Sequence, residues 1–283
     1  MSEGLQTGAN EVFIFNKKPY FYYDLSQNEK NLFKPFYKNS NINKYQIKNS
    51  EKLILYFRSD YKIENYPNIK NYLVENIDTL ENRAQIKRSK QSWYGLLWPR
   101  DEKMFMNKAI VVPYRSQNVS FSISNGNFYS GTDTYFITKL SKDFSYEMLL
   151  GILNSKLAFL WFRNKGKVKG NVLDMTGDNI EQIPIPLLDT PEKCEIAGQI
   201  EVLVEKILEM KTEAEKSHLK RGCEPSERGV SELKHLPPTK LTPSSQEGQN
   251  TTSLETQIDK LVFELYGLSE EEMAVVENQT RQI

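Results

Sequence analysis

The stretch Leu149–Pro186 reads LLGILNSKLAFLWFRNKGKVKGNVLDMTGDNIEQIPIP and joins an apolar helix, a basic loop and a double-proline tag. Apolar residues crowd more than one helical face, which predicts a largely buried helix over Glu147–Phe162. The tag Ile183–Pro186 predicts an extended segment, because proline fixes its own backbone angle and restricts the residue before it. The stretch therefore predicts a buried scaffold that presents a loop.

The loop itself is basic. Its cations are Arg163, Lys165, Lys167 and Lys169. No aspartate or glutamate occurs between Arg163 and Asp174. Gly166 and Gly170 permit backbone turns that bring amide and ammonium groups to one side. Such a loop suits contact with a phosphate backbone. Solubilising charge in a surface turn is the alternative.

Composition and length describe a globular chain. Its 283 residues predict about two domains, and a hydrophobic content of 39% is enough for a sizeable core. No run of 18 apolar residues and no signal-peptide pattern occurs, so we expect no membrane segment and a cytoplasmic protein. Cys194 and Cys223 give neither a disulfide framework nor a metal-ligand spacing, which indicates free thiols and no bound metal.

A net charge of zero conceals two differently charged parts. Residues 1–190 hold 26 Lys+Arg against 19 Asp+Glu, a net +7, whereas residues 191–283 hold 11 against 18, a net −7. A positive part attracts polyanions and a negative part is repelled by them. The asymmetry favours nucleic acid over an acidic small molecule as the partner.

Residues 1–190 predict an α+β domain with mainly antiparallel strands. The strands are expected where β-branched and aromatic residues gather: Val12–Phe15, Leu53–Phe57, Ile110–Tyr114, Phe121–Ser124 and Thr134–Thr138. Besides the helix over Glu147–Phe162, a helix is expected over Ile69–Glu81.

The densest basic segment runs from Arg83 to Arg115 and is interleaved with aromatic residues. Cations hold phosphates, planar side chains stack on bases, and arginine and asparagine match the edges of guanine and adenine. The candidates for phosphates here are Lys87 and Arg88, and those for base edges or aromatic contact are Arg100, Arg115, Asn118, Trp93 and Tyr114. Packing is the alternative for Trp93 and Trp98, and pairing with Asp101 or Asp133 is the alternative for the two arginines.

Residues 191–283 predict a helical region. Apolar stripes within Ile196–Leu208 and Leu254–Tyr266 have matching helical spacing, so the two helices should pack together. Gly267 is placed to end the second helix, and Ser269 with Glu272 forms a capping box for a short third one. Residues 218–253 are rich in Pro, Ser and Gly and predict a flexible linker. The apolar seam of these helices either is internal or contacts a partner.

The order of several short motifs resembles the TaqI-like C-terminal specificity domain, the target-recognition part of type IIG restriction-modification enzymes and adenine-specific DNA methyltransferases. The resemblance covers nearly the whole chain. It rests on GLQTGANEVFIF (Gly4–Phe15), LFKPFYKNSNINKY (Leu32–Tyr45), WPRD (Trp98–Asp101), AIVVPYRS (Ala109–Ser116), FYSGTDTYFI (Phe128–Ile137), the opening stretch, and ELYGLSEEE (Glu264–Glu272).

The resemblance implies recognition of a sequence in duplex DNA, opposite a catalytic domain or subunit that flips an adenine and methylates it with S-adenosylmethionine. The chain itself holds no Asn/Asp-Pro-Pro-Tyr/Phe motif and no glycine-rich cofactor turn, so we expect neither catalysis nor a cofactor site in it. Two other hypotheses stay open. One is an enzyme in its own right, and the other is a helical interaction protein that binds RNA or no nucleic acid.

Overall fold

The computed structural model describes residues 1–88, 91–165, 170, 172–221 and 245–280. These residues group into two compact units. Unit 1 comprises Met1–Tyr146 and Trp161–Pro184, and unit 2 comprises Glu147–Leu160 and Ile185–Ile283. The second unit therefore includes Glu147–Leu160, a stretch that the sequence analysis placed in the first domain.

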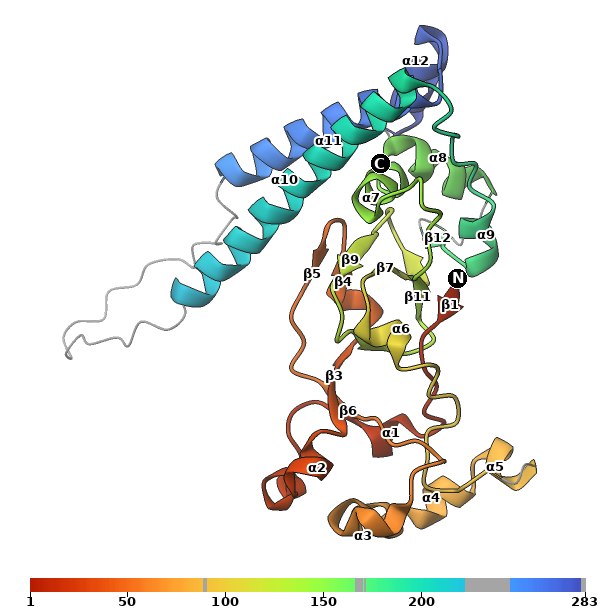
Figure 1. Ribbon diagram of the computed structural model, residues 1–283, viewed down its shortest axis with the longest axis vertical. Coiled ribbons are helices and arrows are strands. Elements are labelled where there is room, and N and C mark those ends of the chain that lie inside the picture. The colour runs from red at the N-terminus through yellow and green to blue at the C-terminus, as the bar shows by residue number, and fades with distance from the viewer. Residues whose placement is uncertain (89–90, 166–169, 171, 222–244, 281–283) are drawn as a thin grey trace, which may run out of the picture. The chain divides into compact units, whose positions relative to one another are not determined.

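Unit 1 is built around two small sheets (Figure 1). The first has the order β1-β11-β7-β9 and is antiparallel throughout. Its strands are β1 (Ser2–Glu3), β11 (Thr134–Ile137), β7 (Ala109–Pro113) and β9 (Ser122–Ser124). Every residue of the central strand β7 is buried, as its uninterrupted apolar sequence AIVVP requires. This sheet positions the segment between β7 and β9, which carries Arg115 and Asn118.

The second sheet of unit 1 has the order β10-β3-β6-β2. Its strands are β10 (Tyr129–Ser130), β3 (Phe33–Tyr37), β6 (Leu53–Leu55) and β2 (Ile14–Phe15). Only the β10–β3 pair among them is parallel. Two further antiparallel pairs complete the strands: β8 (Arg115–Ser116) with β12 (Leu173–Asp174), and β4 (Ile42–Asn43) with β5 (Gln46–Ile47). The predicted α+β class with mainly antiparallel strands is confirmed.

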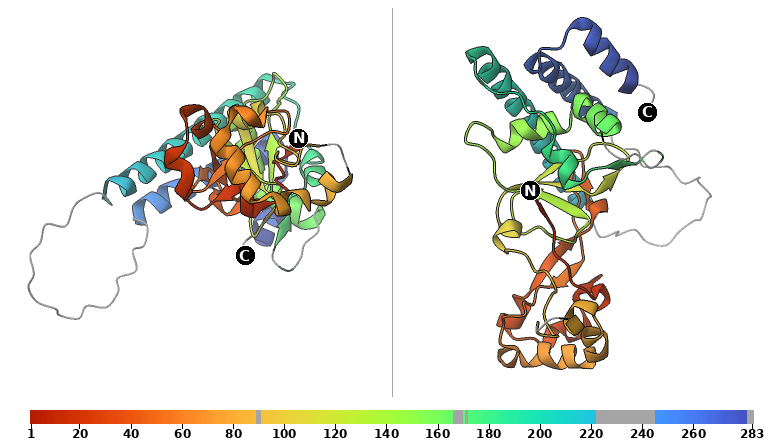
Figure 2. Two further views of the ribbon diagram at one scale, coloured as in Figure 1. Left: turned by 90° about the horizontal axis from the view of Figure 1, so that it is seen from below. Right: turned by 90° about the vertical axis from the view of Figure 1, so that its right-hand side faces the viewer.

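Short helices surround these sheets. They are α1 (Asn10–Phe13), α2 (Gln27–Lys30), α3 (Pro67–Glu75), α4 (Ile77–Glu81), α5 (Ala84–Arg88), α6 (Lys103–Met106) and α9 (Gly177–Glu181), with 3₁₀ turns at η1 (Tyr20–Asp24), η2 (Asn39–Asn41) and η3 (Ile63–Asn65). Figures 1 and 2 place α3, α4 and α5 at one end of unit 1, away from α9. The core between them mixes aliphatic and aromatic side chains, and Phe105 stacks on Tyr129 with 4.9 Å between ring centroids.

Three predicted elements differ from the structure. Val12–Phe15, expected as a strand, is half helix (α1) and half strand (β2), because the Ala9 carbonyl accepts hydrogen bonds from the Val12 and Phe13 amides. The helix expected over Ile69–Glu81 is broken at Asn76 into α3 and α4. The helix expected over Glu147–Phe162 is broken into α7 (Tyr146–Leu153) and α8 (Lys156–Lys165).

The break between α7 and α8 is stabilised by side chains. The Ser155 hydroxyl accepts a hydrogen bond from the Ala158 amide (3.2 Å) and donates one to the Ile152 carbonyl (2.7 Å). Asp259 accepts a hydrogen bond from the Lys156 amide at 2.8 Å. These bonds satisfy backbone groups that a continuous helix would pair internally. The apolar periodicity continues across the break, and so the sequence pattern did not reveal it.

Unit 2 contains the C-terminal helices α10 (Pro191–Arg221), α11 (Ser245–Leu265) and α12 (Glu270–Thr280), together with α7. The predicted stripes form its core, with Ile200, Val204, Ile207, Ile258 and Leu265 all buried, so the seam is internal. The predicted helix end and capping box are confirmed: Gly267 has a φ of 66°, and the Ser269 amide donates to the Glu272 carboxylate at 2.8 Å. The ends of the predicted linker are helical, while residues 222–244 lie outside the described residues.

Glu29 is a buried carboxylate that joins two helices of unit 1. It accepts hydrogen bonds from the Ser26 amide (2.9 Å) at the start of α2 and from the Asn68 amide (2.8 Å) in the first turn of α3. Burial by itself raises the pKa of Glu29, but the hydrogen bonds from Asn68 and Ser26 outweigh it, and the pKa lies below its ordinary value. The charged form therefore stabilises the fold.

We expect Glu29→Gln to lower the free energy of unfolding by about 2–3 kcal/mol at neutral pH, because an amide nitrogen then faces donors. A lowered folded-state pKa contributes stability above the unfolded pKa and loses it as pH falls through the folded pKa. The difference in the free energy of unfolding between wild type and variant, measured with urea, should consequently become smaller below about pH 4.3. Glu64→Gln, at an exposed position, is the control. A difference in unfolding free energy that stays constant with pH contradicts the proposal that the charged form of Glu29 stabilises the fold.

Candidate nucleic-acid interface

The loop that follows β7 is held by the segment that follows α8. In the β8–β12 pair, Arg115 lies opposite Asp174 and Ser116 lies opposite Leu173. The Met175 amide then donates a hydrogen bond to the Tyr114 carbonyl at 2.9 Å. Residues about 60 positions apart in sequence are thus paired with each other.

Arg115 is oriented by two neighbours. Its guanidinium carbon lies 4.8 Å from the centroid of the Tyr114 ring, and its Nε lies 4.0 Å from Asp174 Oδ1. The side chain is still 49% exposed, so part of it remains accessible to a ligand. Arg115 therefore does form an ion pair, as the alternative interpretation predicted, but its partner is Asp174 and not Asp101 or Asp133.

Asn118 lies in the turn between β8 and β9. Its Oδ1 accepts a hydrogen bond from the Val119 amide at 2.8 Å, which fixes the side chain at an exposed position. Val119 and Phe121 are buried and anchor the turn. A second hydrogen bond crosses the turn and joins the Ser116 and Ser120 hydroxyls, whose oxygens are 3.1 Å apart. An exposed amide on an anchored turn is suited to meeting a hydrogen-bonding edge.

The C-terminal half of α8 packs under this turn. The Phe162 ring is buried, 6.0 Å from the Phe121 ring between centroids. Arg163 and Lys165 are exposed, and Lys165 Nζ lies 5.7 Å from the centroid of the Trp161 ring. The structure therefore brings Arg163 and Lys165 to the same part of unit 1 as Asn118. The other two predicted loop cations, Lys167 and Lys169, lie outside the described residues.

A cleft of about 590 Å³ lies beside this surface. Tyr114, Tyr135 and Lys165 line it, but so do four carboxylates, those of Glu3, Asp174, Asp178 and Glu181. The excess of negative charge repels phosphates. Phosphate contacts by the exposed side chains of Arg163 and Lys165 are therefore expected outside the cleft. Tyr135, whose ring lies 6.1 Å from that of Tyr114, was predicted only as part of a strand.

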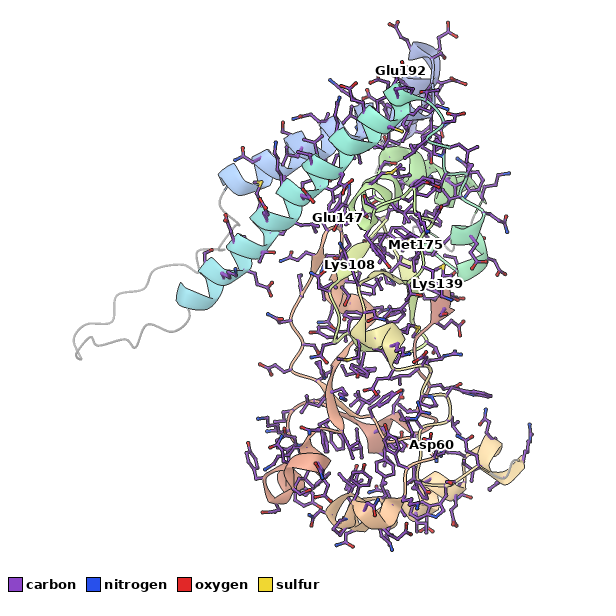
Figure 3. The ribbon with its side chains drawn as sticks, in the orientation of Figure 1. Asp60, Lys108, Lys139, Glu147, Met175 and Glu192 are labelled. Carbon is purple, nitrogen blue, oxygen red and sulfur yellow. The ribbon has the colours of Figure 1, made fainter. Side chains whose placement is uncertain are left out.

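A second predicted group lies elsewhere in unit 1. Lys87 and Arg88 are exposed on α5, and Trp93 is half-buried against the core with its ring 5.7 Å from that of Tyr94. Trp93 thus has the packing role given as its alternative. In Figure 3, Asp60 marks the end of unit 1 that carries α3 and α4, whereas Met175, directly after β12, lies towards the other end. The α5 cations are accordingly separate from the Arg115 surface.

Arg100 is engaged with the N-terminal strand. Its Nε donates to the Gly4 carbonyl at 3.0 Å, and its Nη2 lies 3.4 Å from Glu3 Oε2. The residue also has a φ of 63°, a left-handed conformation that is uncommon for arginine. Its partner is Glu3 and not Asp101 or Asp133. The guanidinium of Arg100 thus holds the chain at Glu3 and Gly4.

Arg83, counted in the basic segment, is buried. Its side chain is 6% exposed and donates to the carbonyls of Thr7 (2.8 Å), Gly95 (2.9 Å), Leu80 (2.9 Å) and Trp93. Burial lowers the pKa of Arg83 to about 10, so it stays charged at neutral pH. The sequence gives no signal that separates this arginine from its exposed neighbours, because each lies in a similar polar context.

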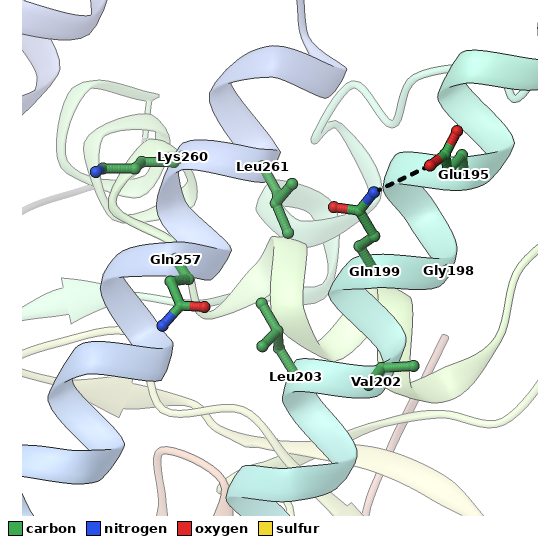
Figure 4. Close-up of a pocket in the computed structure, with 8 residues that line it drawn as sticks. All are labelled: Glu195, Gly198, Gln199, Val202, Leu203, Gln257, Lys260 and Leu261. Atoms are coloured by element: carbon green, nitrogen blue, oxygen red, sulfur yellow. Dashed lines mark hydrogen bonds between the residues drawn. The ribbon is translucent and has the colours of Figure 1, made fainter.

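Unit 2 has an apolar groove between α10 and α11 (Figure 4). It has a volume of about 690 Å³ and is lined by Val202, Leu203 and Leu261, with Lys260 as its single cation. The Gln199 amide bonds Glu195 at 3.4 Å on its rim. Apolar walls and a lone cation do not suit a phosphate backbone.

Among the described residues there is neither a membrane-spanning helix nor a group of side chains suited to a metal ion. Within them, no helix has the length and apolar character needed to cross a membrane. In that same part of the chain, no three His, Cys, Asp or Glu side chains are grouped so that they could hold a metal ion.

Comparison with known proteins gives consistent matches. The family model for the TaqI-like C-terminal specificity domain matches residues 34–185. Over 167 residues the chain is 31% identical to the type II methyltransferase M.HindII of Haemophilus influenzae Rd and 30% identical to M.HincII of Haemophilus influenzae. Both alignments cover 58% of this chain and 32% of the relative, so the chain spans about a third of their length.

Among solved structures, the type IIL restriction-modification enzyme MmeI, determined in complex with DNA, matches with a TM-score of 0.62. The match covers 98% of this chain and 35% of MmeI at 15% sequence identity. Similarity at that level of identity shows a shared fold that extends over both units.

Proposed function

Because the chain belongs to the family of TaqI-like C-terminal specificity domains, we propose that it recognises a specific sequence in duplex DNA as part of a restriction-modification system. The observation that carries the proposal is the single surface formed by the Tyr114–Phe121 loop and α8. It combines an oriented arginine, an anchored amide and exposed cations. These are the groups that base edges and phosphates require.

The proposed roles divide between positioning and readout. Arg163 and Lys165 contact phosphates, joined by Lys167 and Lys169 in the same loop, and Arg115 and Asn118 meet base edges beside Tyr114. Lys87 and Arg88 on α5 contact the backbone at a separate point. Arg100 and Trp93 are assigned to the fold because of the contacts described above.

Catalysis is proposed to lie outside this chain. The partner is an adenine-specific methyltransferase domain or subunit that uses S-adenosylmethionine, and this chain supplies recognition alone. The relatives M.HindII and M.HincII, of which the chain spans 32%, support a methyltransferase as the partner. MmeI, a restriction-modification enzyme with the same fold at its match, supports DNA as the target.

Binding-site selection tests the proposal. The full 283-residue chain is mixed with duplexes of random sequence at moderate salt, bound duplexes are recovered, and the cycle is repeated. The expected result is enrichment of one short sequence over its competitors. Failure to enrich any sequence, with binding that depends only on salt, overturns the proposal and favours a non-specific nucleic-acid binder.

Single substitutions separate the two proposed roles. We expect Lys165→Ala to weaken binding to all duplexes alike and to reduce the slope of log Kobs against log salt by about 1. Asn118→Ala should relax the preference at one position, by about 5- to 150-fold, with little change in that slope. Lys70→Ala, an exposed lysine on α3, is the control. The roles are wrong if Lys165→Ala changes the preferred sequence while Asn118→Ala changes only the slope.

A further inference from the structure

The β4–β5 hairpin has a composition that the roles assigned so far do not use. No aspartate or glutamate occurs from Asn31 to Ser50, a run that contains four lysines. The same run holds five asparagines and one glutamine. A segment with cations and amides but no carboxylate attracts a polyanion and offers it hydrogen bonds.

The register of the hairpin places two amides side by side. Ile42 pairs with Ile47, and Asn43 pairs with Gln46. Side chains alternate between the two faces of a strand, so the isoleucine pair and the amide pair lie on opposite faces. Ile42 is buried and Ile47 packs against the core, which directs the Asn43–Gln46 pair away from it.

Both amides keep hydrogen-bonding capacity. Asn43 Nδ2 makes one long hydrogen bond, to the Asn41 carbonyl at 3.4 Å. For Gln46, the described residues include no side-chain hydrogen-bond partner. Each side chain is partly exposed. The pair therefore presents donors and acceptors outward.

The hairpin is held rigidly at its base. Asn41 Oδ1 accepts a hydrogen bond from the Lys38 amide at 2.9 Å, and Asn41 Nδ2 donates to the carbonyls of Lys48 (3.3 Å) and Asn49 (3.4 Å). A rigid base limits the entropy that the amides lose on binding.

The tip of the hairpin is fixed to the proposed interface. Tyr45 is buried and has a φ of 61°, a conformation that is rare for a bulky residue and persists where the surroundings impose it. Its amide donates a hydrogen bond to the Phe121 carbonyl at 3.0 Å. Phe121 closes the turn that carries Asn118, and Figure 1 shows β4 and β5 beside β9, the strand that follows this turn. The hairpin tip and the Asn118 turn are thus neighbours.

We propose that the β4–β5 hairpin is a second base-reading element, in which Asn43 and Gln46 hydrogen-bond adenine edges in the major groove of the bound duplex. The inference rests on the proposed function. The major groove admits a two-stranded β-ribbon, and asparagine and glutamine pair with N6 and N7 of adenine through two hydrogen bonds. Lys38 and Lys48, exposed before and after the hairpin, contact the flanking phosphates.

Binding-site selection with variants of the full chain tests this assignment. We expect wild type to enrich a site that contains A·T pairs, and Asn43→Ala and Gln46→Ala each to lose the preference for adenine at one position by about 5- to 150-fold. The preference at all other positions, including the one relaxed by Asn118→Ala, should persist. Gln27→Ala, a glutamine exposed on α2 of the same unit, is the matched control and should leave every position unchanged.

The outcomes distinguish the hairpin from the wider proposal. If wild type enriches a site and both hairpin variants keep the same preference at every position, the hairpin assignment is overturned while the proposed function stands. If wild type enriches nothing, both are overturned. Thermal unfolding midpoints within about 2 °C of wild type show that an altered preference does not come from loss of the fold.

Discussion

Replacing Arg83 with methionine is expected to lower the free energy of unfolding by about 3–5 kcal/mol. The guanidinium donates to four backbone carbonyls that belong to three separate parts of unit 1. Methionine fills a similar volume but leaves these buried acceptors unpaired, and each unpaired acceptor costs about 1–3 kcal/mol. Urea unfolding of wild type and variant, with the slope of the transition compared, measures the loss.

Arg88 provides the control for Arg83. It lies five residues further along the chain but is exposed on α5, so Arg88→Met should change stability by less than about 0.5 kcal/mol. The same variant should weaken DNA binding, because Arg88 is a proposed phosphate contact. Equal losses of stability for the two variants contradict the structural role of Arg83. If Arg83→Met does not fold, Arg83→Lys, which keeps the charge and part of the bonding, gives a measurable intermediate.

Replacing Gly151 with valine is expected to destabilise unit 2 by about 3 kcal/mol. A Cβ atom at this position would lie 2.6 Å from Cγ2 of Ile200 and 3.1 Å from Cγ2 of Val204. The first distance is too short for two carbon atoms and the second is tighter than most such contacts, and the two methyl groups of valine add to the overlap. Thermal unfolding, followed by circular dichroism of the helices, measures the effect.

Gly198 is a matched control in the same unit. It lies within α10, and nothing is found within 4 Å of a Cβ built there. Gly198→Ala should therefore raise stability by about 0.5–1 kcal/mol through helix propensity alone. Combining Gly151→Val with Ile200→Ala should cost about 0.5–3 kcal/mol less than the sum of the two single changes. Strict additivity contradicts a close approach of α7 and α10.

Local patterns were sufficient for much of the fold. The strand predicted at Ile110–Tyr114 forms as β7, which begins and ends one residue earlier, and the spacing of Ile200, Val204 and Ile207 predicted the packed face of α10. The capping pair Ser269 and Glu272 gave the start of α12. In each case the signal is carried by a few neighbouring residues whose preference agrees with the final structure.

Features that depend on distant residues were not predictable. The helix break at Ser155 is completed by Asp259, about a hundred positions away, and the burial of Arg83 depends on carbonyls from Thr7 to Gly95. The pairing of Arg115 with Asp174 similarly required the β8–β12 register. A single sequence contains the chemistry of such contacts but not their geometry, so Arg100 and Trp93 were counted with the interface, although their contacts are structural.

The path of the chain through its two units restricts how unit 1 can be exchanged by recombination. The chain passes from unit 1 to unit 2 at Tyr146, returns at Trp161, and leaves again after Pro184. An exchange of unit 1 with a single crossover near Pro184 would also carry in a foreign α7, whose counterpart of Gly151 would then have to accommodate the native Ile200. Homologous exchange should consequently favour crossovers that keep Glu147–Leu160 and the C-terminal helices in the same lineage. The sequence of α7 should then follow the ancestry of α10 and not that of the rest of unit 1.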